Sequence, residues 1–160
     1  MSHPSVTTNP ARPSPVGILT QATLTRYGIA LLRLALGVMF LAHSIVLKLL
    51  TYGLPGTAQF FIGVGLPGWL AYVTFTVEAI GGLLLAAGIQ SRWVALALSP
   101  FLLGALAAVH WQNGWVFTAP NGGWEYPAYL FVLCLAQALL GDGAFALLPS
   151  TLPVSSRKQG

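Results

Sequence analysis

Four long apolar stretches divide the chain, at residues 27–50, 67–89, 92–112 and 126–149. Each is long enough, as a helix, to cross a hydrocarbon layer of about 30 Å. Only residues 90–92 separate the second stretch from the third, so these two must be antiparallel neighbours joined by a tight turn. The pattern predicts an all-α integral membrane protein that folds as a four-helix bundle.

Two longer connections, residues 51–66 and 112–125, lie at the other end of the predicted bundle. The first includes an apolar piece, within TYGLPGTAQFFIGVGLPGW (51–69), that is too short to span a bilayer. Backbone polar groups at membrane depth need partners, so we expect an interfacial or re-entrant segment that covers this end of the bundle.

Composition supports the membrane assignment and sets the domain organisation. Of 160 residues, 56% are hydrophobic and only 6% are charged, and mean hydropathy is +0.76, whereas a soluble domain has roughly 25% charged residues. Membrane lipids are therefore the expected surroundings. We expect a disordered polar tail at 1–26, one membrane domain at 27–149 and a cytoplasmic tail at 150–160.

The charged residues indicate topology rather than nucleic-acid binding. The net charge is +4, but the basic residues are spread singly among apolar segments and form no basic stripe. Those expected on the side of the tails and the short turn are Arg12, Arg26, Arg92, Arg157 and Lys158. The positive-inside rule then places both termini in the cytoplasm.

Ionisable residues inside the predicted spans are the candidate functional groups. Glu78 lies about 16 Å below the outer boundary, too deep for its short side chain to reach water, and His43 lies about 10 Å below it. Lys48 and His110 lie almost at that boundary. Because a charge in lipid costs about 2.5–3.5 kcal/mol or more, these side chains should face protein.

Helical spacing groups these residues around one interior pocket. On the first helix, one polar stripe includes Arg33, Gly37, Phe40, Ser44 and Lys48. On the second, Glu78, Gly82 and Ala86 form a small-residue face that a neighbouring helix can approach closely. We expect a pocket that opens outward, with Glu78 at its floor, His43, Lys48, His110 and Glu125 toward its mouth, and the loop 111–127 as its lid. Alternatively, Arg33 and Lys48 extend to the two interfaces, and the histidines only pack.

The chain also resembles the DoxX family of membrane proteins. The segments that carry the resemblance are RLALGVMFLAHSIVLKL (33–49), GTAQFFIGVGLP (56–67), VEAIGGLLLAAGIQSRWVALAL (77–98), VHWQNG (109–114), GGWEYPAYL (122–130) and GDGAFAL (141–147). The resemblance implies a four-helix bundle in the bacterial inner membrane. The residues that match the family pattern are Arg33, His43, Lys48, Glu78, His110, Asn113, Trp124 and Glu125, and Ser44 replaces an expected glycine.

The resemblance also implies functions, since the family is named after a membrane subunit of an archaeal thiosulfate:quinone oxidoreductase. Its relatives are linked to sulfur handling, oxidative stress and responses to aromatic compounds. The leading hypothesis is a quinone-interacting oxidoreductase subunit that binds ubiquinone or menaquinone and acts with a soluble redox enzyme. In it, His43 or His110 donates to a quinone oxygen, Glu78 relays a proton, and the other five matched residues help to bind the ligand.

Other functions fit the same residues. The pocket could transport a small aromatic molecule, alone or as a homo-oligomer, or the bundle could be a membrane scaffold for soluble redox enzymes. A haem held by His43 and His110 would need both at one depth, but their expected depths differ by about 8 Å. A single cysteine, Cys134, excludes cysteine-based metal sites and an internal disulfide. We expect no metal and no haem.

Overall fold

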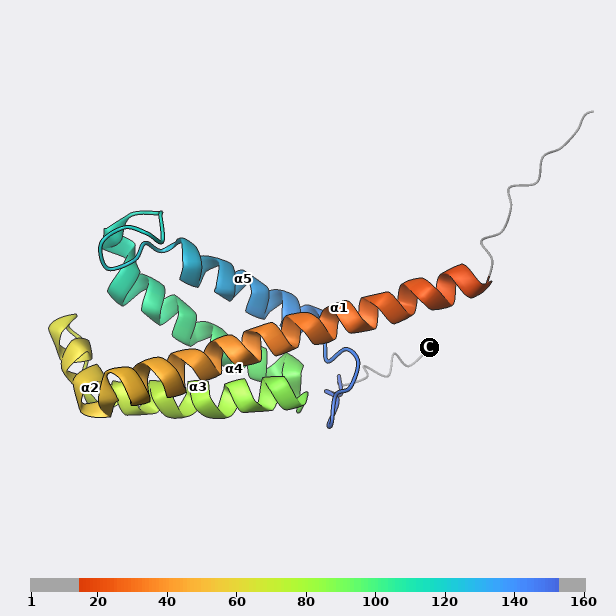
Figure 1. The fold of residues 1–160 in the computed structure, drawn as a ribbon, viewed down its shortest axis with the longest axis horizontal. Helices are drawn as coiled ribbons and strands as arrows, with labels where there is room; N and C mark the ends of the chain where they lie inside the picture. Colours follow the sequence, from red (N-terminus) through yellow and green to blue (C-terminus); the bar gives the residue numbers. More distant parts are fainter. Residues whose placement is uncertain (1–14, 153–160) are drawn as a thin grey trace, which may run out of the picture.

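The computed structural model describes residues 15–152, which are mostly helical (Figure 1). The α-helices are α1 (Pro15–Leu41), α2 (Gly53–Gly63), α3 (Trp69–Ala87), α4 (Ser91–Ala105) and α5 (Glu125–Leu140). A π-helix, η1 (Ala42–Thr51), continues α1, and a second π-helix, η2 (Leu106–His110), continues α4 and leads into the 3-10 helix η3 (Trp111–Asn113). No strand occurs in residues 15–152, so the all-α prediction is confirmed.

Three helical segments are long and apolar enough to cross a membrane, namely Thr20–Thr51, Trp69–Ala87 and Ser91–Asn113. The fourth long helix, α5, is apolar but has only 16 residues. The short α2 forms where the sequence predicts an apolar segment that cannot span. Large apolar side chains are exposed along the outer faces of the long helices, as expected where acyl chains surround a protein.

Two helix boundaries differ from those predicted. The first helix begins at Pro15 rather than at residue 27, and the fixed φ of proline suits a first helical position. Residues 15–26 are thus helical, whereas the rest of the predicted tail, 1–14, lies outside the described residues. The last helix ends at Leu140 rather than at 149, because Gly141 has a φ of +91° and turns the chain back. Residues 153–160 also lie outside the described residues.

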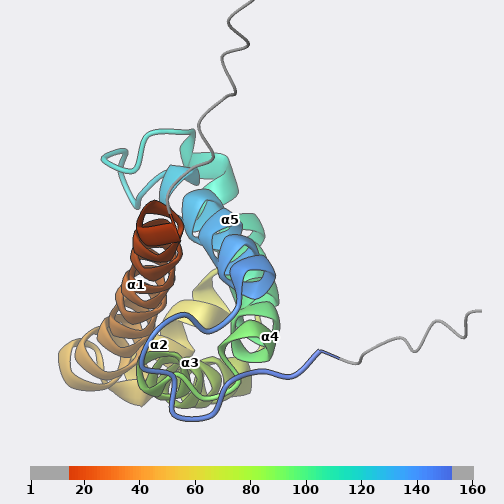
Figure 2. The ribbon, with the colours of Figure 1, turned by 90° about the vertical axis from the view of Figure 1, so that its right-hand side faces the viewer.

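The four long helices pack in the cyclic order α1, α3, α4, α5, with closely packed pairs α1–α3 and α4–α5 (Figures 1 and 2). The core between them consists of Leu36, Phe40, Leu85, Ala95, Leu98, Leu102, Leu130 and Cys134. The two pairs diverge toward the end of the molecule that carries α2, which we call the α2 end (Figure 1). This divergence leaves room for a cavity.

Gly37 on α1 and Gly82 on α3 allow the backbones of these two helices to come into direct contact. A Cβ atom on Gly37 would lie 2.8 Å from the backbone nitrogen of Ala86, and one on Gly82 would lie 3.0 Å from the carbonyl oxygen of Gly37. Real Cβ atoms essentially never come as close as 2.8 Å, and 3.0 Å is tighter than most Cβ contacts, so a side chain at either position requires its neighbours to move. The predicted close approach at Gly82 and Ala86 is confirmed.

The opposite end, which we call the clasp end, is closed by the segment 141–150. Its backbone donates from Ala144 to the carbonyl of Arg26 at 2.9 Å and from Leu148 to the carbonyl of Gly88 at 3.0 Å. The Asp142 carboxylate accepts hydrogen bonds from the backbone N–H of Ser91, 2.8 Å away at the start of α4, and of Ser150, 2.7 Å away. The segment therefore ties α1, α3 and α4 together.

Asp142 is held in its ionised form by these bonds. Burial would raise its pKa, but the backbone N–H groups of Ser150 and Ser91 and the Ser150 hydroxyl more than offset burial, so the pKa lies below the ordinary value of 3.8. An anionic carboxylate at the first turn of α4 also interacts favourably with the helix dipole. Asp142 is thus a structural residue that the sequence patterns do not single out.

Candidate functional site

A cavity of about 850 Å³ lies at the α2 end, between the two diverging helix pairs. Its wall is mainly apolar and aromatic, and it includes Met39, Phe40, Phe60, Phe61, Phe101 and Leu102. The polar side chains that line it are His43, Lys48, Tyr52, Thr57, Thr74, Glu78, His110, Asn121 and Tyr126. A largely apolar cavity with a few polar groups, in this size range, is typical of a site for a small organic molecule.

The cavity contains four of the eight residues singled out in the sequence, namely His43, Lys48, Glu78 and His110. They come from three different helical segments, η1, α3 and η2. The short α2 contributes a further part of the wall, and the segment 111–127, predicted as the lid, contributes Asn121, Tyr126 and Pro127. Of the five residues predicted around one pocket, the structure brings Glu78, His43, Lys48 and His110 together, and Glu125 lies outside.

Both π-helices carry cavity residues. Segment η1 contains His43 and Lys48, and η2 ends at His110. A π-helix widens the turn and re-aims the side chains that follow it, and such segments occur frequently at functional sites. Upstream of η2, Pro100 interrupts the hydrogen bonding of α4, and the Ser99 hydroxyl donates to the carbonyl of Leu96, which lies four residues before the proline, at 2.8 Å.

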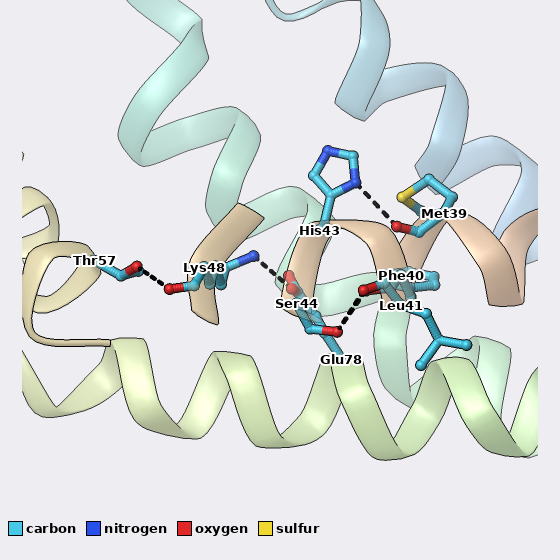
Figure 3. A network of polar contacts seen from close by, with 8 residues as sticks. All are labelled: Met39, Phe40, Leu41, His43, Ser44, Lys48, Thr57 and Glu78. Carbon is cyan, nitrogen blue, oxygen red and sulfur yellow. Dashed lines mark hydrogen bonds and ion pairs between the residues drawn. The ribbon is translucent and has the colours of Figure 1, made fainter. Parts of the chain in front are cut away.

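Lys48 and Glu78 form an ion pair inside the membrane-spanning region (Figure 3). The Lys48 Nζ lies 2.5 Å from the Glu78 Oε2, and the two side chains are 14% and 11% exposed. The Thr57 hydroxyl on α2 donates to the backbone carbonyl of Lys48 at 3.1 Å. Lys48 thus extends inward to Glu78 rather than outward to the interface. Because the two charges are paired, both are tolerated within the apolar segments.

The His43 ring presents one nitrogen to the cavity. Its Nδ1 lies 3.0 Å from the backbone carbonyl of Met39 (Figure 3), and a carbonyl can only accept, so Nδ1 must carry the proton. A neutral His43 then offers the lone pair of Nε2 to a ligand. The ring also stacks on Tyr126 of α5, with centroids 5.8 Å apart and planes 22° apart.

His110, at the end of η2, has the same kind of hydrogen bond from its Nδ1 atom to a backbone carbonyl. Its Nδ1 lies 2.9 Å from the backbone carbonyl of Gly122, so Nδ1 donates and Nε2 is the available nitrogen of the neutral ring. For neutral rings, this reverses the role expected from the sequence, in which a histidine donates to a quinone oxygen. Both cavity histidines instead offer hydrogen-bond acceptors.

The other four predicted residues lie outside the cavity. Arg33 is 2% exposed and lies at the clasp end, where it donates to the carbonyl of Asp142 at 2.5 Å. Asn113 donates to the carbonyl of Gly122 at 2.9 Å, and so helps to hold the carbonyl that His110 uses. The remaining two, Trp124 and Glu125, make contacts that stabilise the outer loop 111–124.

Trp124 and Glu125 give the loop 111–124 its shape. Trp124 packs against Trp111 and Trp115, with ring centroids 5.6 Å and 4.4 Å away. Glu125, at the start of α5, accepts a hydrogen bond from the backbone N–H of Phe117 at 3.3 Å. Together with Asn113, these residues stabilise the loop beside the cavity rather than facing a ligand.

Several cavity residues were not singled out from the sequence. Thr57, Phe60 and Phe61 lie on α2, and the apolar piece predicted in the first outer loop was the available signal for them. Tyr126 follows the matched Glu125 and becomes a wall residue through its stacking on His43. In the part of the chain that the structure describes, no three His, Cys, Asp or Glu side chains are grouped so that they could hold a metal ion.

Comparison with known proteins identifies the family. The DoxX family matches residues 28–111, which include the part of α1 from residue 28 onward, α3 and α4, and both π-helical extensions. This chain belongs to the DoxX family. A relative from Bacillus subtilis (strain 168), named "Putative oxidoreductase CatD", is 33% identical over 122 residues, which cover 76% of this chain and 85% of the relative. No solved structure matches this DoxX protein.

Proposed function

We propose that this DoxX protein is a quinone-interacting membrane subunit of an oxidoreductase system linked to sulfur or oxidative-stress chemistry. The observation that carries the proposal is the cavity of about 850 Å³ at the α2 end, in which an apolar wall surrounds two histidines and an ion pair. An apolar ring and tail fit the wall, and the polar groups can bind the ring oxygens. The name of the Bacillus subtilis relative, which includes "oxidoreductase", agrees with this class.

Quinone chemistry couples electrons to protons, and the cavity offers groups that take up protons. The Nε2 atoms of His43 and His110 are proton acceptors, and the Glu78 carboxylate, paired with Lys48, lies on the same wall. A proton taken up at Glu78 would weaken its attraction to Lys48 and so couple protonation to the packing of η1 on α3. Electrons would come from a soluble redox enzyme that docks on the membrane surface.

The proposal includes a location, the bacterial inner membrane, with four transmembrane helices and both termini in the cytoplasm. Arg26 and Arg92 support this orientation, because both lie at the clasp end, where 141–150 joins α1 and α4. The positive-inside rule places such residues on the cytoplasmic side. The cavity then lies in the outer half of the bilayer, where ubiquinone or menaquinone can enter from the lipid.

A cavity-blocking substitution tests the proposal. Gly104 lines the cavity, and a Cβ atom added there meets nothing within 4 Å, so Gly104→Phe should fill the space without breaking the fold. Gly28→Phe is the matched control, because Gly28 is equally unobstructed but lies outside the cavity wall. The measurement is mass spectrometry of the lipids that co-purify with each protein in mild detergent.

We expect near-stoichiometric quinone with the wild type and the Gly28→Phe variant, and little with Gly104→Phe. Quinone at the detergent background in all three proteins would contradict the proposal and favour transport or scaffolding. Equal retention by wild type and Gly104→Phe would place the quinone outside this cavity.

A further inference from the structure

We propose that the cavity selects the reduced, hydroxyl-bearing form of its ring ligand, a hydroquinone or a related phenol, whose O–H groups donate to Nε2 of His43 or His110. This inference rests on the proposed function and deepens it, because it names the redox form that the site prefers. It concerns binding alone and requires no electron transfer.

The backbone fixes the tautomer of both histidines. Met39 and Gly122 supply carbonyl oxygens at 3.0 Å and 2.9 Å from Nδ1 of His43 and His110. Since those oxygens have no proton to give, each neutral ring keeps its proton on Nδ1 and its lone pair on Nε2. Within residues 15–152, neither Nε2 takes part in a hydrogen bond, so both remain available to a ligand.

The other polar groups of the wall include both acceptors and donors, so the preference argued here rests on the two Nε2 atoms. Glu78 is a carboxylate, and Lys48, the cavity's cation, already donates to it at 2.5 Å. The Thr57 hydroxyl proton is directed at the carbonyls of Lys48 and Gly53, at 3.1 and 3.0 Å, so toward a ligand its oxygen can only accept. Lys48 uses one of its three N–H donors for the bond to Glu78 and can still donate, as can the wall groups Tyr52, Thr74, Asn121 and Tyr126.

A quinone and a hydroquinone differ in whether their ring oxygens can donate a hydrogen bond to these acceptors. Quinone oxygens only accept, so placing one against Nε2 or the Glu78 carboxylate opposes two lone pairs and leaves both groups desolvated. Hydroquinone oxygens carry protons and can donate to the same atoms. The stacked pair of His43 and Tyr126 adds an aromatic surface beside Nε2, which suits a planar ring in either form.

Three ligands with the same tail separate donor chemistry from shape. They are decylubiquinol, decylubiquinone, and the ether in which both ring hydroxyls of decylubiquinol are methylated. Each is equilibrated anaerobically with full-length protein in nanodiscs and with empty nanodiscs, and the bound excess is quantified by mass spectrometry. We expect the quinol to bind roughly tenfold more tightly than the quinone, and the ether no more tightly than the quinone.

Asparagine substitutions test the role of Nε2. In His43→Asn, the side-chain amide can keep the bond to the Met39 carbonyl while Nε2 is lost, and His110→Asn does the same at Gly122. We expect each to reduce the preference for quinol several-fold with little change in quinone binding. Thr76→Val is the control, since Thr76 is exposed on α3, lies outside the cavity wall and bonds only within its helix.

The outcomes separate this inference from the proposed function. If quinone binds as tightly as quinol, or if the methylated ether equals the quinol, the donor-based preference is wrong while the quinone site stands. If none of the three ligands binds above empty nanodiscs, the proposed function fails and this inference fails with it. If the asparagine variants keep the full preference for quinol, the histidines are not its source.

Discussion

Lys48 on η1 and Glu78 on α3 form a direct ion pair, with Nζ and Oε2 2.5 Å apart, inside the apolar part of a DoxX protein. The pair joins the helix that carries His43 to its neighbour and faces the cavity. The stability of the fold and the geometry of the proposed site therefore depend on the same pair, because each charge needs the other to remain in an apolar environment.

Removing one member of the pair should cost more than removing both. Lys48→Met leaves the Glu78 carboxylate buried without its partner, and we expect it to lower the free energy of unfolding by about 3 kcal/mol. The double variant Lys48→Met with Glu78→Leu should recover most of that loss. Unfolding in mixed detergent micelles measures both. A double variant that loses at least as much stability as Lys48→Met would contradict this expectation.

The close approach of α1 and α3 predicts different effects for two glycines of the same helix. Gly37→Ala forces a Cβ against the backbone of α3, and we expect a loss of about 1–3 kcal/mol. Gly28→Ala meets nothing within 4 Å and should be neutral or stabilise by up to about 1 kcal/mol. The same unfolding assay compares them. A neutral Gly37→Ala would contradict the backbone contact.

Asp142 should make stability depend on acidic pH. Its pKa is lower in the folded protein than the ordinary 3.8, so its stabilisation is complete above that value and is lost as pH falls toward the folded pKa. We expect Asp142→Ala to cost about 1–2 kcal/mol at pH 7 and less as pH falls below 3.8. Glu125→Gln is the control carboxyl variant. A difference between wild type and Asp142→Ala that does not change with pH would show that the charge is irrelevant.

Cysteine labelling tests the proposed orientation. In a Cys134→Ala background, Thr118→Cys lies in the loop at the α2 end and Thr151→Cys lies beyond the clasp end, both exposed. A membrane-impermeant maleimide should label Thr118→Cys in intact cells and Thr151→Cys only after lysis. The reverse pattern would place the termini outside.

The long helices and the inward side of the first two could be predicted from the sequence, but the level at which each residue lies along the neighbouring helices could not. Long apolar runs identify spans, and Glu78 is too deep to lie anywhere but inside. Arg33 and Lys48 share one stripe, yet 15 residues of helix separate them by about 22 Å, so only Lys48 reaches the cavity. A stripe gives the side of a helix and says nothing of where the neighbouring helices diverge.

The finer geometry depends on contacts between distant segments. The pairing of Lys48 with Glu78 requires the rotation and height of α3 against η1, which helical periodicity does not determine. The π-helices have no periodic signal in the sequence, although they position His43 and His110. Asn113 and Trp124 match the family pattern, but their roles follow from backbone bonds such as that from Trp124 N–H to the Gly114 carbonyl at 3.0 Å.

The most direct test of the proposed quinone site is photoaffinity labelling. A photoreactive azidoquinone is crosslinked to the full-length protein in nanodiscs, and the modified peptides are mapped by mass spectrometry. The account predicts adducts in the cavity segments 39–48, 56–61 and 101–110, which excess ubiquinone and the Gly104→Phe substitution both suppress. Adducts confined to lipid-facing positions such as Leu83 and Leu96, and unchanged by Gly104→Phe, would contradict it.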